Sequence, residues 1–475
     1  MSKYRSESLF SSQQDDQESP CGHIIRVAFE AGVDSEFDYA VPDKLWPVQV
    51  GQRVEVPFGV KNKLHKGFCA QTDLPAEQSF TAGGKGRRLK AVTAVVDKEP
   101  LLDASLMELA RWISSYYICP LGQVIAAMVP SAVKKGIGVK KVKYLYLASQ
   151  YEEIADQIKG AKQKQVISFL AGEKAFDVES AVSLEIILHE IGCTAAPITT
   201  LAEKALVKIT QKTVFKSLPA IPDSMTLKTG KIDLNQDQQN AIEHIKRRLD
   251  TAQFDVTLIH GVTDSGKTEV YIRAIQACLE KNRSAIVLLP EIALTAQTVQ
   301  RFNDRFENIA VMHSGLSAAQ RNVQWQKIRA GQADVVIGAR SAVFAPLPNL
   351  GIIVVDEEHE PGYKQDTSPR YNARDVAIKR CQLANGLCLL GSATPSLETL
   401  HNCRHKQHFS LVKLPKRVMD LPMPEMKLVD LRQDLSIKQG VDLISGQLAK
   451  YLHQALLKKE QAILLLNRRG YSNFI

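Results

Sequence analysis

The sequence lacks paired cysteines, long apolar runs and an apolar N-terminal leader. Eight cysteines are scattered over 475 residues without a Cys-x-x-Cys pair, so neither a zinc site nor a disulfide framework is predicted. No apolar run approaches the roughly 18 residues that cross a bilayer, and the N-terminus has no signal-peptide segment. We therefore expect a cytoplasmic protein with no membrane partner and no zinc in this chain.

The composition that remains is that of a globular, mildly basic protein. Hydrophobic residues make up 45% and charged residues 23% of the chain, which is enough for the cores of roughly two to four domains. Lys and Arg outnumber Asp and Glu by 60 to 51, giving a net charge of +9. This surplus favours a polyanionic partner. A mildly basic enzyme without such a partner is the alternative.

Successive sequence patterns divide the chain into regions. Residues 1–20 are polar and nearly free of aliphatic side chains, so we expect a disordered extension. Short β-branched and aromatic runs predict a small β domain over residues 21–130. Amphipathic segments over residues 140–222 have the scale of a winged helix. Over residues 230–430 apolar strands alternate with helical patterns, which predicts a multidomain chain ending in an α/β lobe with a doubly wound parallel sheet.

A glycine-rich segment follows the first apolar strand of this α/β lobe. It fits G-x-x-x-x-G-K-[ST] and comprises Gly261, Val262, Thr263, Asp264, Ser265, Gly266, Lys267 and Thr268. In such a loop, backbone N–H groups point at phosphate oxygens beside a helix N-terminus. We expect Lys267 to hold the outer phosphates of ATP and Thr268 to offer its hydroxyl to magnesium.

An acidic segment ends another apolar run of the same lobe. Residues 351–355 are followed by Asp356, Glu357, Glu358 and His359. At the end of a neighbouring strand, Asp356 is the expected carboxylate ligand of magnesium, and Glu357 would position or deprotonate the attacking water. Taken alone, this segment also fits an ordinary solvated strand end. Together with the glycine-rich loop, it predicts a nucleotide hydrolase.

Five further segments accompany these two motifs, at residues 234–238, 289–295, 313–315, 338–341 and 391–395. In the first, Gln238 can read the adenine edge with both a donor and an acceptor. The next three lie at predicted strand ends and suit a grip on a nucleic-acid backbone. The last segment suits coupling between the nucleotide bound at the ATP site and the binding of the nucleic-acid strand. The ordered set resembles the motifs of superfamily 2 helicases.

Longer stretches are similar to a narrower family. Residues 261–271, 289–295, 356–365, 370–375 and 464–471 resemble the primosomal protein N′ (PriA) family of bacterial replication-restart helicases. The resemblance implies a β domain that recognises the 3′ end of a nascent strand at a stalled fork, a winged helix, and a DNA-dependent ATPase that unwinds DNA from 3′ to 5′. It also implies forked and single-stranded DNA, primosome proteins and single-stranded-DNA-binding protein as partners, and association with the bacterial nucleoid.

The resemblance assigns DNA contacts to the β domain. Its family pocket corresponds to Phe37, Asp38, Tyr39 and Lys90. An aromatic ring there would stack on the terminal base, the Asp would accept a hydrogen bond from the free 3′ hydroxyl, and the Lys would meet phosphate. From the residue pattern alone, Phe37 and Tyr39 are better explained as core residues of a strand.

A second group of implied DNA contacts lies in the α/β lobe. By the same resemblance, the segment from Tyr363 to Arg374 senses single-stranded DNA and signals to the ATP site. Tyr363 and Tyr371 would stack on bases, and Lys364, Arg370 and Arg374 would meet phosphates. Three further residues belong to the group that would couple binding of single-stranded DNA to the ATP site: Arg340, Ser392 and Thr394. A plain surface loop remains the alternative.

The sequence departs from the family pattern at two places. Asp264 stands where many relatives have Gly, and its charge beside the phosphates would weaken ATP binding. The chain stops at Ile475, so residues 431–475 are expected to be an incomplete start of the second helicase lobe, without the last motif and its arginine. We therefore expect little ATP hydrolysis and no unwinding by this chain alone. The alternatives are a fork-DNA-binding fragment without ATPase activity and an RNA-remodelling enzyme of superfamily 2.

Overall fold

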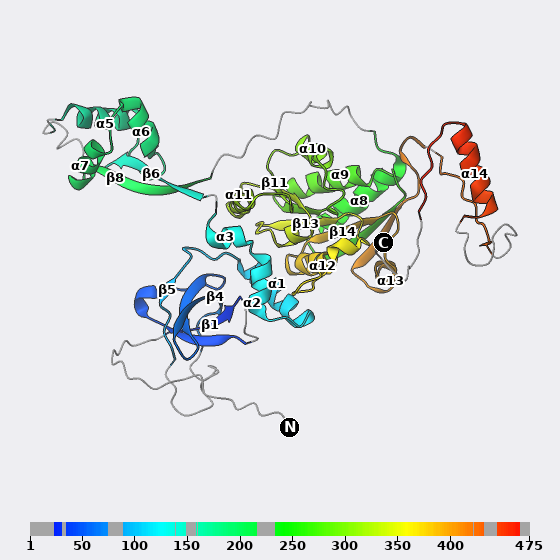
Figure 1. Ribbon diagram of the computed structural model, residues 1–475, viewed down its shortest axis with the longest axis horizontal. Coiled ribbons are helices and arrows are strands. Elements are labelled where there is room, and N and C mark those ends of the chain that lie inside the picture. Colours follow the sequence, from blue (N-terminus) through cyan, green and yellow to red (C-terminus); the bar gives the residue numbers. More distant parts are fainter. Residues whose placement is uncertain are drawn as a thin grey trace, which may run out of the picture. The chain divides into compact units, whose positions relative to one another are not determined.

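The computed structural model forms two compact units, Met1–Val418 and Met419–Ile475 (Figure 1). It describes residues 23–30, 35–74, 89–137, 139–148, 158, 160–215, 233–420, 422–431 and 444–465. The expected extension over residues 1–20 and the tail motif within residues 464–471 fall outside or mostly outside these ranges. Both therefore remain sequence predictions.

The first sheet of the larger unit is antiparallel with strand order β2-β1-β4-β3-β5. Its strands are β1 (His23–Phe29), β2 (Phe37–Val41), β3 (Arg53–Phe58), β4 (Lys63–Gln71) and β5 (Ala94–Val95), with the short helix η1 (Asp43–Leu45) after β2. Alternate side chains of these strands, among them Ile25, Val27, Val54 and Val56, form one apolar core. The period of two in the sequence produces this half-buried sheet.

Three helices follow the first sheet: α1 (Ala104–Tyr116), α2 (Leu121–Met128) and α3 (Ser131–Lys135). The Asp103 carboxylate begins α1 by accepting a hydrogen bond from the backbone N–H of Leu106 at 2.8 Å. Gly122 lets α2 approach β1 closely, because a Cβ at this position would lie 1.7 Å from the carbonyl oxygen of Phe29. Helices α1 and α2 thus bind directly to the first sheet.

A smaller sheet with order β7-β6-β8 comes next in the chain. Its elements are β6 (Val139–Leu147), α5 (Ala161–Gly172), β7 (Val182–Ser183), α6 (Leu184–Ile191), α7 (Ala196–Glu203) and β8 (Val207–Phe215). Helices α6 and α7 are joined by a short turn in which Gly192 adopts a φ of 59°. This order agrees with a helix-turn-helix between strands, and the winged-helix assignment remains a prediction.

The largest sheet has seven parallel strands in the order β11-β12-β10-β13-β14-β9-β15. The strands are β9 (Asp255–Gly261), β10 (Ser284–Leu288), β11 (Ile309–Met312), β12 (Val335–Gly338), β13 (Leu350–Val355), β14 (Leu387–Ser392) and β15 (Phe409–Leu414). The predicted α/β lobe with a parallel, doubly wound sheet is therefore confirmed.

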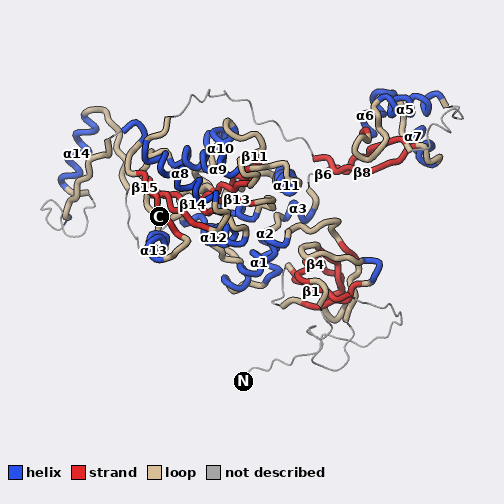
Figure 2. The backbone as a smooth tube through the Cα atoms, turned by 180° about the vertical axis from the view of Figure 1, so that it is seen from behind, coloured by secondary structure: helices blue, strands red, loops and turns tan. Residues whose placement is uncertain are grey.

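Helices cover both faces of this sheet (Figures 1 and 2). They are α8 (Gln236–Asp250), α9 (Lys267–Leu279), α10 (Ala296–Asn303), α11 (Ala318–Arg329), α12 (Ala373–Leu383) and α13 (Leu397–His405), with the short helices η3 (Arg340–Phe344) and η4 (Pro361–Tyr363). Along β13, Ile352 and Val354 pack into the core of α8 and α9, whereas Ile353 and Val355 pack into the core of α11 and α12. Burial on both faces explains why these strands are continuous apolar runs.

The smaller unit begins within η5 (Val418–Asp420) and contains α14 (Gly446–Leu457). The Ser445 side chain starts α14 by accepting a hydrogen bond from the N–H of Leu448. The apolar residues 462–465 belong to no strand in the part of the unit that is described. Among all described residues, no helix is long and apolar enough to cross a membrane.

Candidate nucleotide site and nucleic-acid interface

The loop predicted to bind phosphate lies between β9 and α9, where the sequence pattern places it. Gly266 has a φ of 79°, and Asp264, at 60°, adopts the same left-handed region despite its side chain. Lys267 is the first residue of α9, and its Nζ donates a hydrogen bond to the carbonyl of Gly261 at 3.0 Å. The same Nζ lies 3.8 Å from Oε1 of Glu357. The loop therefore places a cation and the N-terminus of a helix beside the acidic segment.

Asp356 follows β13, and the hydroxyl of Tyr271 donates a hydrogen bond to its Oδ1 at 2.9 Å. Burial, and next the charge of Glu357, raise the pKa of the Asp356 carboxyl. A cation beside Asp356 would relieve both effects. The sequence pattern identifies Tyr271 only as a core position of α9. A Cβ at Gly391 would lie 1.6 Å from the Tyr271 hydroxyl, so glycine there leaves room for this contact.

The residues around the loop fit a magnesium nucleotide. Magnesium in such sites takes few protein ligands and completes its shell with phosphate oxygens and water. Among the described residues, no group of three or more His, Cys, Asp or Glu side chains could hold a metal ion. The carboxylate of Asp356 and the hydroxyl of Thr268 remain the predicted protein ligands of the ion.

Gln238 lies beside the loop with both ends of its amide occupied. Its Oε1 accepts a hydrogen bond from the N–H of Asn235 at 3.0 Å, and its Nε2 donates to the carbonyl of Ser265 at 2.9 Å. The side chain thus joins the start of α8 to the phosphate loop. Recognition of adenine by Gln238 stays a prediction, and it would use the second lone pair of Oε1 and the second N–H of Nε2.

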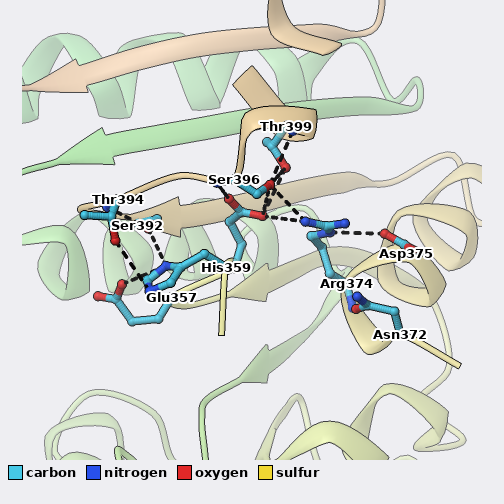
Figure 3. Close-up of polar contacts among 10 residues, drawn as sticks. Glu357, His359, Asn372, Arg374, Asp375, Ser392, Thr394, Ser396 and Thr399 are labelled. Atoms are coloured by element: carbon cyan, nitrogen blue, oxygen red, sulfur yellow. Dashed lines mark hydrogen bonds and ion pairs between the residues drawn. The ribbon is translucent and has the colours of Figure 1, made fainter. Parts of the chain in front are cut away.

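Two residues at the end of β14 contact the acidic segment (Figure 3). The Oγ of Ser392 is 2.7 Å from Nδ1 of His359 and accepts a hydrogen bond from the N–H of Thr394 at 3.0 Å. His359 Nδ1 also lies 3.6 Å from Oε2 of Glu357. Ser392 and Thr394 therefore lie one side chain away from the predicted catalytic carboxylate.

Glu358, which the sequence does not distinguish from a solvated acid, has a fully buried side chain that accepts several hydrogen bonds. Its carboxylate accepts hydrogen bonds from the Ser396 N–H at 2.6 Å, the Ser396 hydroxyl at 3.1 Å, the Thr399 hydroxyl at 3.0 Å and Arg374 Nη1 at 3.0 Å. Arg374 donates in addition to Asp375 at 3.1 Å. Arg374, predicted to meet a phosphate, is thus engaged inside the protein in this structure.

The two tyrosines of the predicted DNA-sensing segment are buried, with 2% of Tyr363 and 1% of Tyr371 exposed. The Tyr363 hydroxyl lies 2.7 Å from the carbonyl oxygen of Asp356 and 3.0 Å from that of Leu288. The Tyr371 ring packs edge-on against Phe344 at 4.9 Å. In this conformation neither ring offers a face to a base. Instead, both anchor the segment against the strand ends of the ATP site.

The basic side chains of the same segment are more accessible. Lys364 and Arg370 are exposed, and Arg340 Nη1 donates hydrogen bonds to the carbonyls of Lys364 at 2.6 Å and Gly362 at 3.3 Å. A cavity of about 270 Å³ beside Arg340 is also lined by residues 289–292, Glu360, Gly362 and Tyr363, so it contains the acids Glu291 and Glu360. The basic side chains of the segment suit contact with a phosphate backbone.

In the first sheet, the residues predicted to bind a DNA 3′ end are engaged within the protein, either in the apolar core or in polar contacts. The Asp38 side chain is buried and forms an ion pair with Arg26 at 2.8 Å, and Tyr39 is 3% exposed with its hydroxyl donating to the carbonyl of Pro57. Phe37 is half-buried. Lys90 Nζ donates to a backbone carbonyl at 2.8 Å, and burial lowers its pKa. Arg26, the partner of Asp38 across the strands, carried no signal in the sequence.

Comparison with family models matches two parts of the chain. Residues 26–130 match the 3′ DNA-binding domain (3′BD) of PriA. Residues 235–403 match the DEAD/DEAH box helicase family. The first match covers the antiparallel sheet with α1 and α2, and the second covers most of the parallel sheet.

Curated relatives align along most of the chain. Replication restart protein PriA of Bacillus subtilis (strain 168) is 35% identical over 93% of this chain and 61% of its own length. The Haemophilus influenzae protein of the same name is 33% identical over 94% of this chain and 59% of its own length. That of Synechocystis sp. is 40% identical over 61% of this chain and 34% of its own length. The chain spans about three fifths of the length of the first two relatives.

Solved structures give a weaker likeness. The structure of RecG bound to a three-way DNA junction has a TM-score of 0.31 and 22% identity, and it covers 42% of this chain and 26% of that chain. A likeness at this level supports no further argument. Taken together, the two family-model matches and the relatives that align over more than nine tenths of its residues support the identification of the chain as similar to replication restart protein PriA.

Proposed function

We propose that this chain is the N-terminal portion of a DNA-dependent ATPase and 3′-to-5′ helicase that recognises stalled or abandoned replication forks and initiates primosome assembly. One observation carries the proposal: β9, β14 and β13 are neighbours in the sheet, and the motif after each contacts another. Lys267 Nζ lies 3.8 Å from Glu357, and Ser392 lies 2.7 Å from His359. Phosphate cradle, catalytic acid and coupling residue form one continuous site.

In this site, Lys267 and the N-terminus of α9 hold the outer phosphates, and Asp356 with Thr268 hold magnesium. Bound magnesium supplies charge neutralisation at the transferring phosphate. Glu357 orients the attacking water and accepts its proton. Tyr271 fixes the Asp356 carboxylate through the 2.9 Å hydrogen bond. The geometry suits hydrolysis by positioning and electrostatics, which is how phosphoryl transfer is generally catalysed.

The assignment of the phosphate loop is tested by Lys267→Ala in the 475-residue chain. We expect magnesium-ATP binding, measured by calorimetry, to weaken by roughly tenfold to hundredfold, because loss of a charged hydrogen-bond donor costs about 1.5–3 kcal/mol. Lys246→Ala on the exposed face of α8 is the matched control. Equal affinity of the two variants for ATP would contradict the role of the loop.

The proposed substrates are forked and single-stranded DNA, with primosome proteins and single-stranded-DNA-binding protein as partners. The match of residues 26–130 to a 3′ DNA-binding domain supports the choice of DNA over RNA. Preference for a DNA fork with a free 3′ hydroxyl over a matched RNA duplex would separate this function from that of an RNA-remodelling enzyme.

Residues 1–475 assayed alone should bind ATP yet hydrolyse it slowly and not unwind DNA. The described residues contain one parallel sheet of this kind, whereas ATP in two-lobed helicases is also contacted by an arginine of a second lobe, which contributes about 10³ to 10⁵ in rate in related hydrolases. A phosphate-release assay with forked DNA, with and without the C-terminal part of a relative, tests this. A fork-DNA binder without ATPase activity is the second candidate, and binding without any turnover after that addition would favour it.

A further inference from the structure

Helices α1 and α2, which lie within the match to the 3′ DNA-binding domain, share one hydrophobic core with the α/β lobe. Leu106, Leu109 and Ile125 belong to the same buried cluster as Val376 and Ala377 of α12. Close-packed interiors transmit displacement because they contain few voids. A shift of α1 and α2 would therefore displace α12. The predicted DNA-sensing segment directly precedes α12.

The turn between α1 and α2 makes polar contacts with that segment. The hydroxyl of Tyr117 accepts a hydrogen bond from the backbone N–H of Asn372 at 3.1 Å, and the Nζ of Lys364 lies 5.1 Å from the centre of the Tyr117 ring. Ser368 Oγ is 3.2 Å from Sγ of Cys119 and donates a hydrogen bond to Gln123 at 3.1 Å. The turn therefore contacts the segment near both of its ends and in its middle.

From the segment, the contacts continue into the ATP site by two routes. Asn372, which lies beside Arg374 (Figure 3), caps α12 by accepting a hydrogen bond from the N–H of Arg374. The guanidinium of Arg374 binds the buried Glu358. Tyr363 places its hydroxyl 2.7 Å from the carbonyl oxygen of Asp356. Both routes end on residues of the acidic motif.

On its other side, the same turn borders a cavity of about 540 Å³. Its walls include Phe29 of β1, Glu36 just before β2, and Ile118, Cys119 and Gly122 of the turn and α2. Glu36 directly precedes Phe37, whose ring packs edge-on against Phe29 at 6.0 Å. A ligand bound at this part of the sheet would therefore lie close to the turn that holds Asn372.

We infer that the turn formed by residues 117–123 is the joint through which occupancy of the first sheet by a DNA end changes the affinity of the ATP site, with Tyr117 as its positioning residue. The inference rests on the proposed function, since it requires that both ligands bind. Coupling of this kind is reciprocal: DNA changes the affinity for ATP by the same factor as ATP changes the affinity for DNA. The segment 361–372 contacts the turn through Asn372 and the acidic motif through Tyr363. In this inference it is the element whose conformation both ligands bias.

The experiment measures this factor in the 475-residue chain without relying on hydrolysis. The dissociation constant of a slowly hydrolysed magnesium-ATP analogue is determined with and without a saturating forked oligonucleotide that carries a free 3′ hydroxyl. We expect the two constants to differ about fivefold or more, the lower end of typical coupling factors. In Tyr117→Phe, which removes only the acceptor of the Asn372 N–H, this ratio should fall below about twofold.

Two further variants complete the test. Tyr116→Phe removes a hydroxyl from the neighbouring tyrosine, which is 60% exposed, and should keep the wild-type ratio. Gln123→Ala breaks the second contact, with Ser368, and should lower the ratio. Thermal melting of each variant shows whether it folds, and the affinity for DNA in the absence of nucleotide should stay within about twofold of wild type, since Tyr117 lies outside both proposed sites.

The outcomes are distinct. A wild-type chain that binds neither the analogue nor the fork overturns the proposed function and this inference with it. A chain that binds both ligands with a ratio of one overturns the inference alone. The inference also fails if Tyr117→Phe keeps the wild-type ratio, or if it weakens analogue binding equally with and without DNA, because that result indicates a purely local structural role.

Discussion

The parallel and antiparallel sheets present their predicted sites in different ways. In the parallel sheet, the motifs follow the carboxyl ends of β9, β13 and β14, so side chains from distant parts of the sequence meet at one edge. In the antiparallel sheet, Phe37, Asp38 and Tyr39 are consecutive within β2, and consecutive strand residues point to opposite faces. Asp38 therefore pairs with Arg26 on one face, while Tyr39 enters the core on the other.

This difference shows that a sequence motif locates a binding site more reliably at the end of a strand than within one. At a strand end the backbone leaves the sheet, and its side chains become free to converge on a ligand. Within a strand, the pleat fixes each side chain to one face. β2 is the last strand of its sheet, and its outer edge is hydrogen-bonded at Ala40 to the backbone of Lys90 and Val92. This pairing places Lys90 next to β2.

The largest effect that we predict is a loss of stability on substituting Glu358, which is buried beside the site of the parallel sheet. Glu358→Ala removes the buried acceptor of Ser396, Thr399 and Arg374. Arg374 keeps Asp375 as its remaining carboxylate partner. Because one charged partner and several hydrogen bonds are lost together, we expect the free energy of unfolding to fall by about 3–5 kcal/mol. Chemical denaturation measures this loss. Glu398→Ala, an exposed acid in the first turn of α13, is the control and should change stability by less than about 1 kcal/mol. A similar loss of stability in both variants would mean that the hydrogen bonds of Glu358 do not stabilise the fold more than an exposed acid does.

The second prediction concerns the effect of Tyr271 on the pKa of the Asp356 carboxyl. The hydrogen bond from Tyr271 opposes the increase that burial and Glu357 cause in the pKa of Asp356. Tyr271→Phe should therefore raise this pKa further and weaken magnesium-ATP binding by roughly threefold to tenfold near neutral pH. Because Asp356 must be ionised to bind magnesium, affinity should decline as pH falls, and the decline should begin at a higher pH in the variant. Calorimetry across pH tests this, and superimposable pH profiles would contradict it.

The raised pKa of Asp356 also has a consequence for the free protein. A group whose pKa is higher in the folded state stabilises the fold below its unfolded pKa, and this contribution disappears as pH rises through the folded pKa. Magnesium-ATP should therefore raise the melting temperature more above the pKa of Asp356 than below it. An increase that does not depend on pH would argue against Asp356 as the ligand.

The third prediction addresses the antiparallel sheet, where we expect smaller effects. DNA with a free 3′ hydroxyl should bind more tightly than DNA with a 3′ phosphate, because the added charge is repelled by Asp38. Asp38→Asn should reduce this preference by a few-fold. Asp43→Asn, an exposed acid in η1, should leave the preference unchanged. Equal affinity of the wild-type chain for the two ends would remove Asp38 from the site.

The smallest predicted effect lies at the surface of the phosphate loop. Arg417 Nη2 lies 2.6 Å from Oδ2 of Asp264, whose side chain is 63% exposed. This pairing partly neutralises the charge that Asp264 places beside the phosphates. Asp264→Gly should therefore tighten ATP binding by no more than about threefold, as expected for an exposed charge pair. Arg417→Ala should weaken binding in wild type more than in Asp264→Gly, and equal losses in a double-mutant cycle would show that the two residues act independently.

The sequence by itself determined the parallel sheet and the order of its motifs, because strands buried on both faces read as apolar runs and a phosphate loop requires Gly266, Lys267 and Thr268 in a fixed order. It could not determine side-chain pairing. Glu358 and Arg374 are 16 residues apart in the chain, and Arg26 and Asp38 are 12 apart, and only the folded backbone brings each pair together. Tyr363 and Tyr371 show the same limit: their composition suits base stacking, but packing against the strand ends buries both rings. Local pattern specifies secondary structure and loop chemistry, whereas contacts between distant segments decide which polar groups are buried, paired and free to act.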